Sequence, residues 1–142
     1  MPVILDTDHL TILQQHDSRE SERLWIRLAA LPADDVSTSI VSVQERMQGW
    51  LAYLNNAKKA TEILFAYAEL ERLWHFIARM NVLSFTAEAQ DRFDRFRKQK
   101  LRTRTLDLRI GCLALTTDSI VLTKNLRDFE TIPGVRAEDW TR

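Results

Sequence analysis

The sequence predicts an α/β fold with a parallel central sheet of four or five strands and helices on both faces. Short apolar runs, such as Val3–Leu5 and Ile120–Leu122, alternate with longer segments of helical periodicity. Runs that are apolar at every position are typical of strands buried on both faces. Only 3 Gly and 3 Pro occur among 142 residues, too few for the many turns of an all-β sandwich or barrel.

The N-terminal third is expected to contain two strands, two helices and a turn. The strands are Val3–Leu5 and Val36–Ile40, because both are short and rich in β-branched residues. Ser39 or Ser42 is expected to cap the helix that carries Glu45. The other expected features are helical positions at Leu10–Leu13 and Leu24–Leu28, a polar loop near Gln14–Glu22 and a turn at Pro32–Asp35.

The stretch Trp50–Ile77 has apolar residues at alternating spacings of four and three, which is helical periodicity. It is longer than a usual globular helix, and Asn55–Asn56 is the expected break, giving two helices in a hairpin. We expect most of this stripe to be core. Its aromatic residues could also leave an apolar patch for self-association or for a partner helix, and the sequence leaves both open.

The C-terminal part repeats the alternation of strands and helices. Expected here are a strand at Val82–Phe85, a charged helix at Ala87–Leu101, a helix at Thr105–Leu115, a strand at Ile120–Leu122, a turn at Pro133–Gly134 and a short edge strand at Val135–Trp140. No repeat or linker divides the chain, so residues 1–142 are expected to form one domain.

Composition excludes several classes of function. Lys and Arg number 20 and Asp and Glu 20, so any attraction to nucleic acid must come from a local patch. No run of eighteen apolar residues occurs and the N-terminus has no basic region, so we expect no membrane contact, no signal peptide and a cytoplasmic location. One cysteine, Cys112, excludes an intrachain disulfide and a cysteine zinc site. The three histidines, His9, His16 and His75, lack metal-ligand spacing and are expected to be ordinary core or surface residues.

Four carboxylates are expected at the sheet edge where ligands bind in open parallel sheets. Asp6 directly follows the first strand, and Asp128 follows the strand Ile120–Leu122. Glu45 and Asp107 fall on or near the first turns of helices at the same edge. Singly, each is equally typical of a cap, a turn or a solvated helix. Together they would repel unless a cation neutralised them, and oxygen ligands select Mg²⁺ or Mn²⁺. Such a site indicates hydrolysis of phosphodiesters or phosphomonoesters by a metal-activated water.

Four segments in order resemble the motifs of PIN-domain ribonucleases, in particular the VapC-type toxins of toxin–antitoxin pairs. These segments are Leu5–Leu10, Ser39–Arg46, Leu106–Gly111 and Leu122–Phe129, and the ending Ile132–Trp140 is also similar. Asp8 stands where many members have asparagine. The resemblance implies a Mg²⁺- or Mn²⁺-dependent endoribonuclease that is held inactive by a cognate antitoxin and is commonly dimeric.

The resemblance also implies roles for individual residues. Asp6 and Asp107 would be the main metal ligands, Glu45 would hold or deprotonate the attacking water, and Asp128 would bind a second metal or order a water. The residues expected to orient these carboxylates are Asp8, Thr123 and Asn125.

A basic segment, Arg92–Arg104, precedes Asp107 and contains seven Lys or Arg and one acid, Asp94. A solvated helix face would have the same composition. Next to a phosphodiester-cleaving site, however, it predicts contacts to the RNA backbone. The residues expected to make these contacts are Arg97, Lys100, Arg102 and Arg104.

Two other functions remain open at this stage. Asp6–Leu10 partly matches the opening motif of phosphatases of the haloacid dehalogenase type, in which the first Asp is a nucleophile and the second an acid or base. Leu10 and the lack of a downstream Gly-Asp-x-x-x-Asp motif weaken that match. The other alternative is a non-catalytic module that binds RNA or a protein partner. An Asp8→Asn substitution should abolish phosphatase chemistry and leave a nuclease substantially active.

Overall fold

The structure is a computed structural model that describes residues 1–142, and it centres on one parallel sheet of five strands. The strand order is β3-β2-β1-β4-β5, with each neighbouring pair parallel. The strands are β1 (Val3–Leu5), β2 (Val36–Ser39), β3 (Val82–Leu83), β4 (Ile120–Leu122) and β5 (Arg136–Glu138). β1 is central: Leu5 is in register with Thr38 of β2 and Leu122 of β4. The predicted fold class is therefore confirmed.

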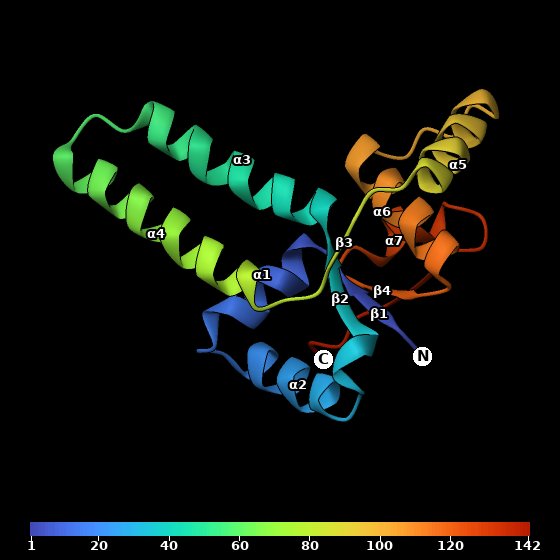
Figure 1. The fold of residues 1–142 in the computed structure, drawn as a ribbon, viewed down its shortest axis with the longest axis horizontal. Coiled ribbons are helices and arrows are strands. Elements are labelled where there is room, and N and C mark those ends of the chain that lie inside the picture. The colour runs from blue at the N-terminus through green and yellow to red at the C-terminus, as the bar shows by residue number, and fades with distance from the viewer.

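Helices cover both faces of the sheet (Figure 1). They are α1 (Thr7–Gln15), α2 (Arg19–Ala29), α3 (Ile40–Asn56), α4 (Ala60–Ala78), α5 (Ala87–Lys98), α6 (Thr105–Thr117) and α7 (Leu126–Glu130), with a short 3-10 helix at Ala33–Asp35. None of these helices is long and apolar enough to cross a membrane.

The apolar side chains of β1 alternate between two cores. Ile4 packs into a core built mainly from α6, with Phe129 of α7 and Val41 of α3. Val3 and Leu5 face a second core that contains Leu13 of α1, Leu24 and Leu28 of α2, and Trp140. Every residue of β1 is buried in one core or the other, which explains why the strand is apolar at each of its positions.

The predicted hairpin forms, but its burial was predicted wrongly. α3 ends at Asn56 and α4 begins at Ala60, which places the break where it was expected. The two helices project together away from the sheet (Figure 1), and α4 packs mainly against α3, whereas α3 also packs against α1, α6 and β2. Ala66 and Leu73 are buried, whereas Leu64 is 71% exposed and Trp74 is 68% exposed. The apolar stripe is therefore mostly surface.

Most other elements lie within a few residues of their predicted positions. The loop between α1 and α2 spans only three residues, 16–18, because Ser18 caps α2 and accepts a hydrogen bond from the Ser21 N–H. Ser39 caps α3 through the Ser42 N–H. The helix α7 was not predicted, because five residues are too few to show helical periodicity.

Candidate active site

Asp6 lies at the centre of the sheet edge. It follows β1 directly and caps α1, with its Oδ1 accepting the Thr7 N–H at 2.8 Å. Its Oδ2 accepts the Thr123 hydroxyl at 2.9 Å, and Thr123 itself follows β4, the neighbouring strand. The carboxylate is only 4% exposed. Burial is the main cause that raises the pKa of Asp6 to about 7, and the nearby Asp8 carboxylate raises it further.

Asp8 and Thr123 form the next layer of contacts. Asp8 Oδ2 accepts the Lys124 backbone N–H at 2.9 Å and lies 3.3 Å from the Thr123 hydroxyl oxygen. The Asn125 backbone N–H donates to that same oxygen at 3.0 Å. The loop after β4 is therefore fastened to the start of α1, and Thr123 lies between two carboxylates. Asn125 was expected to orient a carboxylate through its side chain, but that side chain is exposed and the residue contacts Thr123 only through its backbone N–H.

Glu45 approaches the same edge from α3, one turn further into the helix than predicted. Its Oε1 accepts the hydroxyl proton of Thr7, the residue after Asp6. Its Oε2 lies 3.5 Å from the Arg104 guanidinium, just ahead of α6. Glu45 is half-buried, so its carboxylate is more accessible than those of Asp6 and Asp107.

Asp107 lies on the first turn of α6 and is 5% exposed. Its Oδ2 is buried without a hydrogen-bond partner. Arg104 is the nearest cation, at 3.9 Å. Burial raises the pKa of Asp107 most, Arg104 opposes this, and the carboxylates of Asp128, Glu45 and Asp8 raise it further. Asp107 therefore lies within electrostatic reach of the other predicted acids.

Asp128, on α7, is exposed at the rim. With Arg102, Arg104 and Thr131 it borders a hollow of about 420 Å³. A second hollow, of about 290 Å³, is bordered by Glu45 together with Thr7, Trp50 and Tyr53, among others. Two of the predicted acids, Asp128 and Glu45, therefore each border an open depression.

The donor set suits a divalent cation, although the side chains do not form a ready-made cage. No group of three or more His, Cys, Asp or Glu side chains lies close enough to hold a metal ion in this arrangement. Buried carboxylates with raised pKa values, and an orphaned buried oxygen on Asp107, are what a cation-binding edge presents before its charge is neutralised. These oxygen donors fit Mg²⁺ or Mn²⁺.

The basic residues predicted to bind RNA occupy different environments. Arg97 donates to the Leu101 carbonyl at 2.7 Å and to the Thr105 hydroxyl at 3.2 Å, and it stacks on Phe93. Arg104 faces the acids, as described above. Lys100 and Arg102 are exposed and make no hydrogen bond or ion pair through their side chains.

Comparisons with known proteins agree with the predicted family likeness. A curated protein named tRNA(fMet)-specific endonuclease VapC, from Salmonella typhimurium strain LT2, is 38% identical over 69 residues, which is 46% of this chain and 52% of that protein. The match thus spans about half the length of the curated relative. No family model matches the chain.

Solved structures extend the likeness to the whole fold. VapBC-1 from nontypeable Haemophilus influenzae matches with a TM-score of 0.76 at 20% identity and full coverage of both chains. VapBC2 from Rickettsia felis, bound to a promoter DNA fragment, matches with a TM-score of 0.74 at 19% identity and 99% coverage of both chains. DNA-bound VapBC from Salmonella typhimurium has a TM-score of 0.73 at 24% identity, covering 99% of this chain and 98% of that one. The predicted resemblance to VapC-type proteins is confirmed.

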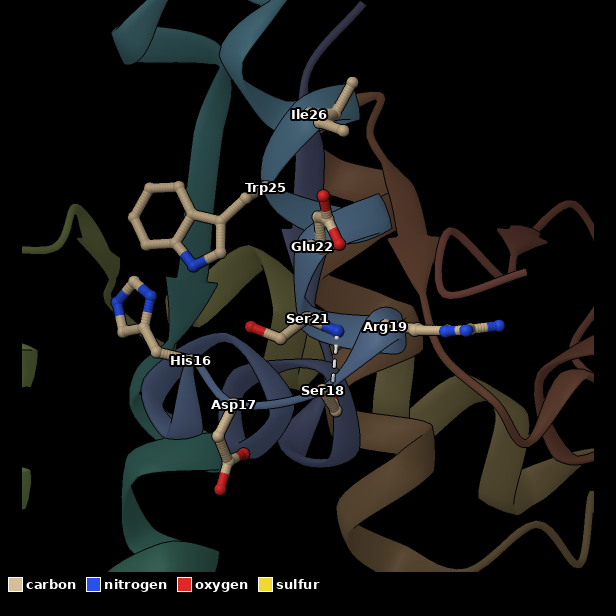
Figure 2. Close-up of a pocket in the computed structure, with 8 residues that line it drawn as sticks. All are labelled: His16, Asp17, Ser18, Arg19, Ser21, Glu22, Trp25 and Ile26. Atoms are coloured by element: carbon tan, nitrogen blue, oxygen red, sulfur yellow. Dashed lines mark hydrogen bonds between the residues drawn. The ribbon is translucent and has the colours of Figure 1, made fainter.

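Two features of this VapC-like chain were missed in the sequence. His9 was expected to be an ordinary core or surface residue. Its ring is completely buried, and its hydrogen bond to Asp8 was not predicted. The available signal was its place beside Leu10 and Leu13 on the buried face of α1. The other missed feature is a hollow at the corner between α1 and α2 (Figure 2), bordered by Ser18, Ser21 and Trp25 among others. None of the predicted site residues lines it.

Proposed function

We propose that the chain is a VapC-type toxin, a Mg²⁺- or Mn²⁺-dependent endoribonuclease that cleaves RNA phosphodiesters at the carboxylate edge of the sheet. The strongest support is Asp107 Oδ2, a buried oxygen without a partner among acids that come from four separate elements. A carboxylate oxygen in that position is costly to bury unless a cation neutralises it. The likeness to a VapC endonuclease supports the choice of RNA as substrate.

The side chains suggest a division of roles. Asp6 and Asp107 are the most deeply buried acids and would be the main ligands of the cation. Asp128, on the rim, would hold a second cation or order a water. A bound cation would polarise the phosphodiester and acidify a coordinated water. Thr123 holds the Asp6 carboxylate by its hydroxyl, and the Thr7 hydroxyl holds Glu45. Glu45, which is only half-buried, would orient the attacking water and take its proton.

The hollow beside Asp128 would receive the RNA backbone. Arg102 and Arg104 border it and would contact phosphates, with Lys100 and Arg97 nearby in the chain. Arg104 lies beside Glu45 and Asp107, 3.5 Å and 3.9 Å from their carboxylates. If a cation neutralised these acids, the Arg104 guanidinium would be free to bind a phosphate oxygen.

A cognate antitoxin and a second copy of the chain are the proposed protein partners. The α3–α4 hairpin exposes Leu64, Tyr67 and Trp74 on one stripe. A separate apolar hollow of about 470 Å³ is bordered by Trp25, Phe76 and Met80, among others. Exposed apolar surface of this kind is typical of protein interfaces. The structural neighbours are described as VapBC complexes, which supports an antitoxin partner.

The decisive experiment is cleavage of total RNA by the purified chain, with the cut ends mapped by sequencing. We expect cleavage with Mg²⁺ or Mn²⁺ and none with EDTA. Asp6→Ala and Asp107→Ala should each lower the rate by at least about 100-fold, since each removes a main ligand. Cleavage by both variants at the wild-type rate would refute the proposal.

Asp8→Asn distinguishes the proposal from a phosphatase. In a nuclease the asparagine can still accept the Lys124 N–H through its oxygen, although it no longer accepts from His9, so cleavage should be weakened and still remain substantial. In a phosphatase of the haloacid dehalogenase type, the acid or base would be lost. Binding of RNA that is the same with EDTA and with Mg²⁺, without cleavage, would instead indicate a non-catalytic module.

A further inference from the structure

His9 connects the acidic edge to the C-terminal segment Asp139–Thr141. The imidazole is fully buried between α1 and this segment. Its Nδ1 lies 2.8 Å from Asp8 Oδ1. On the other side of the ring, the Trp140 backbone N–H donates to Nε2 at 3.1 Å.

These contacts define one tautomer. Because the Trp140 N–H directs its proton at Nε2, that nitrogen has to be the unprotonated one. The single ring proton is therefore on Nδ1 and is donated to Asp8. Asp139 Oδ1, 3.5 Å from Nε2, is a weaker candidate partner, since it already accepts the Thr141 N–H at 2.9 Å and the Thr141 hydroxyl at 2.6 Å.

The C-terminal segment is itself held in place by α2. The Arg23 guanidinium donates to the Thr141 carbonyl at 3.2 Å. The Arg27 guanidinium stacks 4.4 Å over the Trp140 ring, which packs in the core beneath α2. The amide that faces His9 Nε2 therefore belongs to a fixed segment of backbone, which is what selects the tautomer.

Asp8 links the fixed His9 ring to Asp6, the candidate cation ligand. With its Oδ1 held by His9, its Oδ2 is directed at the Lys124 N–H and the Thr123 hydroxyl. That hydroxyl has one proton and lies 2.9 Å from Asp6 Oδ2. If Asp8 turned away, the Lys124 amide would lose its acceptor and the loop that presents Thr123 to Asp6 would lose its anchor.

We propose that His9 is a positioning residue, which orients Asp8 and, through the Thr123 loop, the Asp6 carboxylate, while the segment Asp139–Thr141 holds the imidazole in the tautomer that this requires. The proposal rests on the proposed function in one respect, that Asp6 is a cation ligand. The chain of hydrogen bonds is independent of that function.

Two substitutions of His9 separate the contacts on either side of the ring. Asparagine places its amide nitrogen near the position of Nδ1, so His9→Asn can still donate to Asp8 and loses only the acceptor for Trp140. Glutamine reaches the position of Nε2, so His9→Gln can still accept the Trp140 N–H and leaves Asp8 Oδ1 without its donor. Both substitutions remove the ring. If His9 only filled space, the two variants would therefore lose Mn²⁺ affinity to the same extent.

The test measures Mn²⁺ binding by electron paramagnetic resonance on the full chain, with no RNA present. We expect His9→Gln to bind Mn²⁺ about 10–100-fold more weakly than wild type, as is usual when a group that orients a ligand is removed. His9→Asn should bind at least about tenfold more tightly than His9→Gln. Long-range ¹H–¹⁵N spectra of the wild type should show the His9 proton on Nδ1. In RNA cleavage, His9→Gln should lower kcat and leave KM unchanged.

Several results would overturn the proposal. One is the same Mn²⁺ affinity in the wild type and both variants. Another is an equal loss of Mn²⁺ affinity in both variants that parallels their loss of thermal stability. A His9 proton found on Nε2, or no Mn²⁺ binding by the wild type, would also overturn it. Failure of the proposed function looks different: the Mn²⁺ difference between the variants would be present, and the wild type would cut no RNA. Conversely, RNA cleavage with no difference between the variants would reject only the role of His9.

Discussion

Asp6 is a buried carboxylate that destabilises the fold when it is ionised. It is almost completely buried, and its two polar contacts do not compensate for the lost hydration and the nearby Asp8 charge, so its pKa rises to about 7. In an unfolded chain the same group would titrate near 3.8. The metal-free fold is therefore penalised by this group as the pH rises through that window, and the penalty is complete above the folded-state pKa.

Asp6→Asn should consequently stabilise the metal-free protein. The amide resembles the protonated acid, so the gain in unfolding free energy should reach up to about 4 kcal/mol at pH 8 and less than half of that at pH 5. Urea denaturation in EDTA at the two pH values measures this. A gain that is the same at both pH values would contradict the raised pKa.

Thr123 should matter through its hydroxyl alone. Thr123→Val keeps the shape of this buried side chain but removes the donor to Asp6 and the acceptor for the Asn125 N–H. We expect a loss of about 1–3 kcal/mol in unfolding free energy and a further rise in the pKa of Asp6, because the Thr123 hydroxyl lowers it. Denaturation and carboxyl ¹³C NMR titration measure the two effects. The control Thr123→Ser keeps the hydroxyl, and a similar change there would refute this account.

For single residues, the sequence predicts which side chains belong to the candidate site better than it predicts which of them contact one another. Asp6 and Asp107 could be placed at the sheet edge because each follows a recognisable element boundary. The links from Thr7 to Glu45 and from His9 to Trp140 join residues 38 and 131 positions apart. Such pairings depend on how α1 packs against α3 and the C-terminal segment, and no local pattern in the sequence specifies that packing.

Among the elements, α6 has a position, Gly111, at which its neighbours restrict the size of the side chain. A Cβ at Gly111 would come within 2.6 Å of Ile132 Cδ1, and Ile132 is itself buried. The helix therefore approaches the turn that follows α7 too closely for a larger residue. Cys112, next to it, is a core residue, and burial raises the pKa of its thiol to about 11, so it is an unreactive small side chain.

Gly111→Ala should destabilise the protein in spite of alanine's helix propensity. The propensity gain is about 1 kcal/mol, whereas overpacking a tight core costs about 1–3 kcal/mol, so we expect a net loss of roughly 1 kcal/mol. Gly49→Ala in α3 is the matched control, because a Cβ there meets nothing within 4 Å. The control should gain about 0.5–1 kcal/mol. Chemical denaturation of both variants tests the prediction, which fails if Gly111→Ala is as stable as Gly49→Ala.

Element boundaries were predictable where a cap or a break in periodicity marks them. Ser39 lies just before a helix and the Asn55–Asn56 pair at the end of that helix, as predicted. Ser18 also caps a helix, but it was expected to lie within a loop. Whether the apolar stripe of the α3–α4 hairpin is buried or exposed was not predictable, because periodicity shows that a face is apolar and does not show what covers it. A helix pair that extends beyond its own core leaves such a face exposed.

Because the net charge of the whole molecule is zero, any affinity for RNA has to come from a local basic patch. Lys100→Gln combined with Arg102→Gln should weaken RNA binding and reduce the slope of log K against log salt by about 1.4, since each lost phosphate contact on a single strand accounts for about 0.7. Filter binding over a range of salt concentrations measures this. Lys58→Gln combined with Lys59→Gln, at the far tip of the hairpin (Figure 1), is the control with equal charge change and should leave the slope unaltered.

The hairpin should govern association. Leu64→Glu combined with Tyr67→Glu places two charges on the exposed stripe of α4. We expect sedimentation velocity to show a dimeric wild type and a monomeric variant, with circular dichroism unchanged because both positions are more than half exposed. A variant that stays dimeric would show that the copies meet through another surface.

The order of the strands also has a consequence for biosynthesis. Asp6 leaves the ribosome early, but Thr123 and Asp128 belong to the segment around β4, which pairs with β1 only after more than a hundred further residues have been translated. Until then the central strand has a neighbour on one side only, and the acids contributed by α6 and α7 are missing. If the carboxylate edge cleaves RNA as proposed, a growing polypeptide would be inactive until the segment through α7 has been translated and β4 has paired with β1.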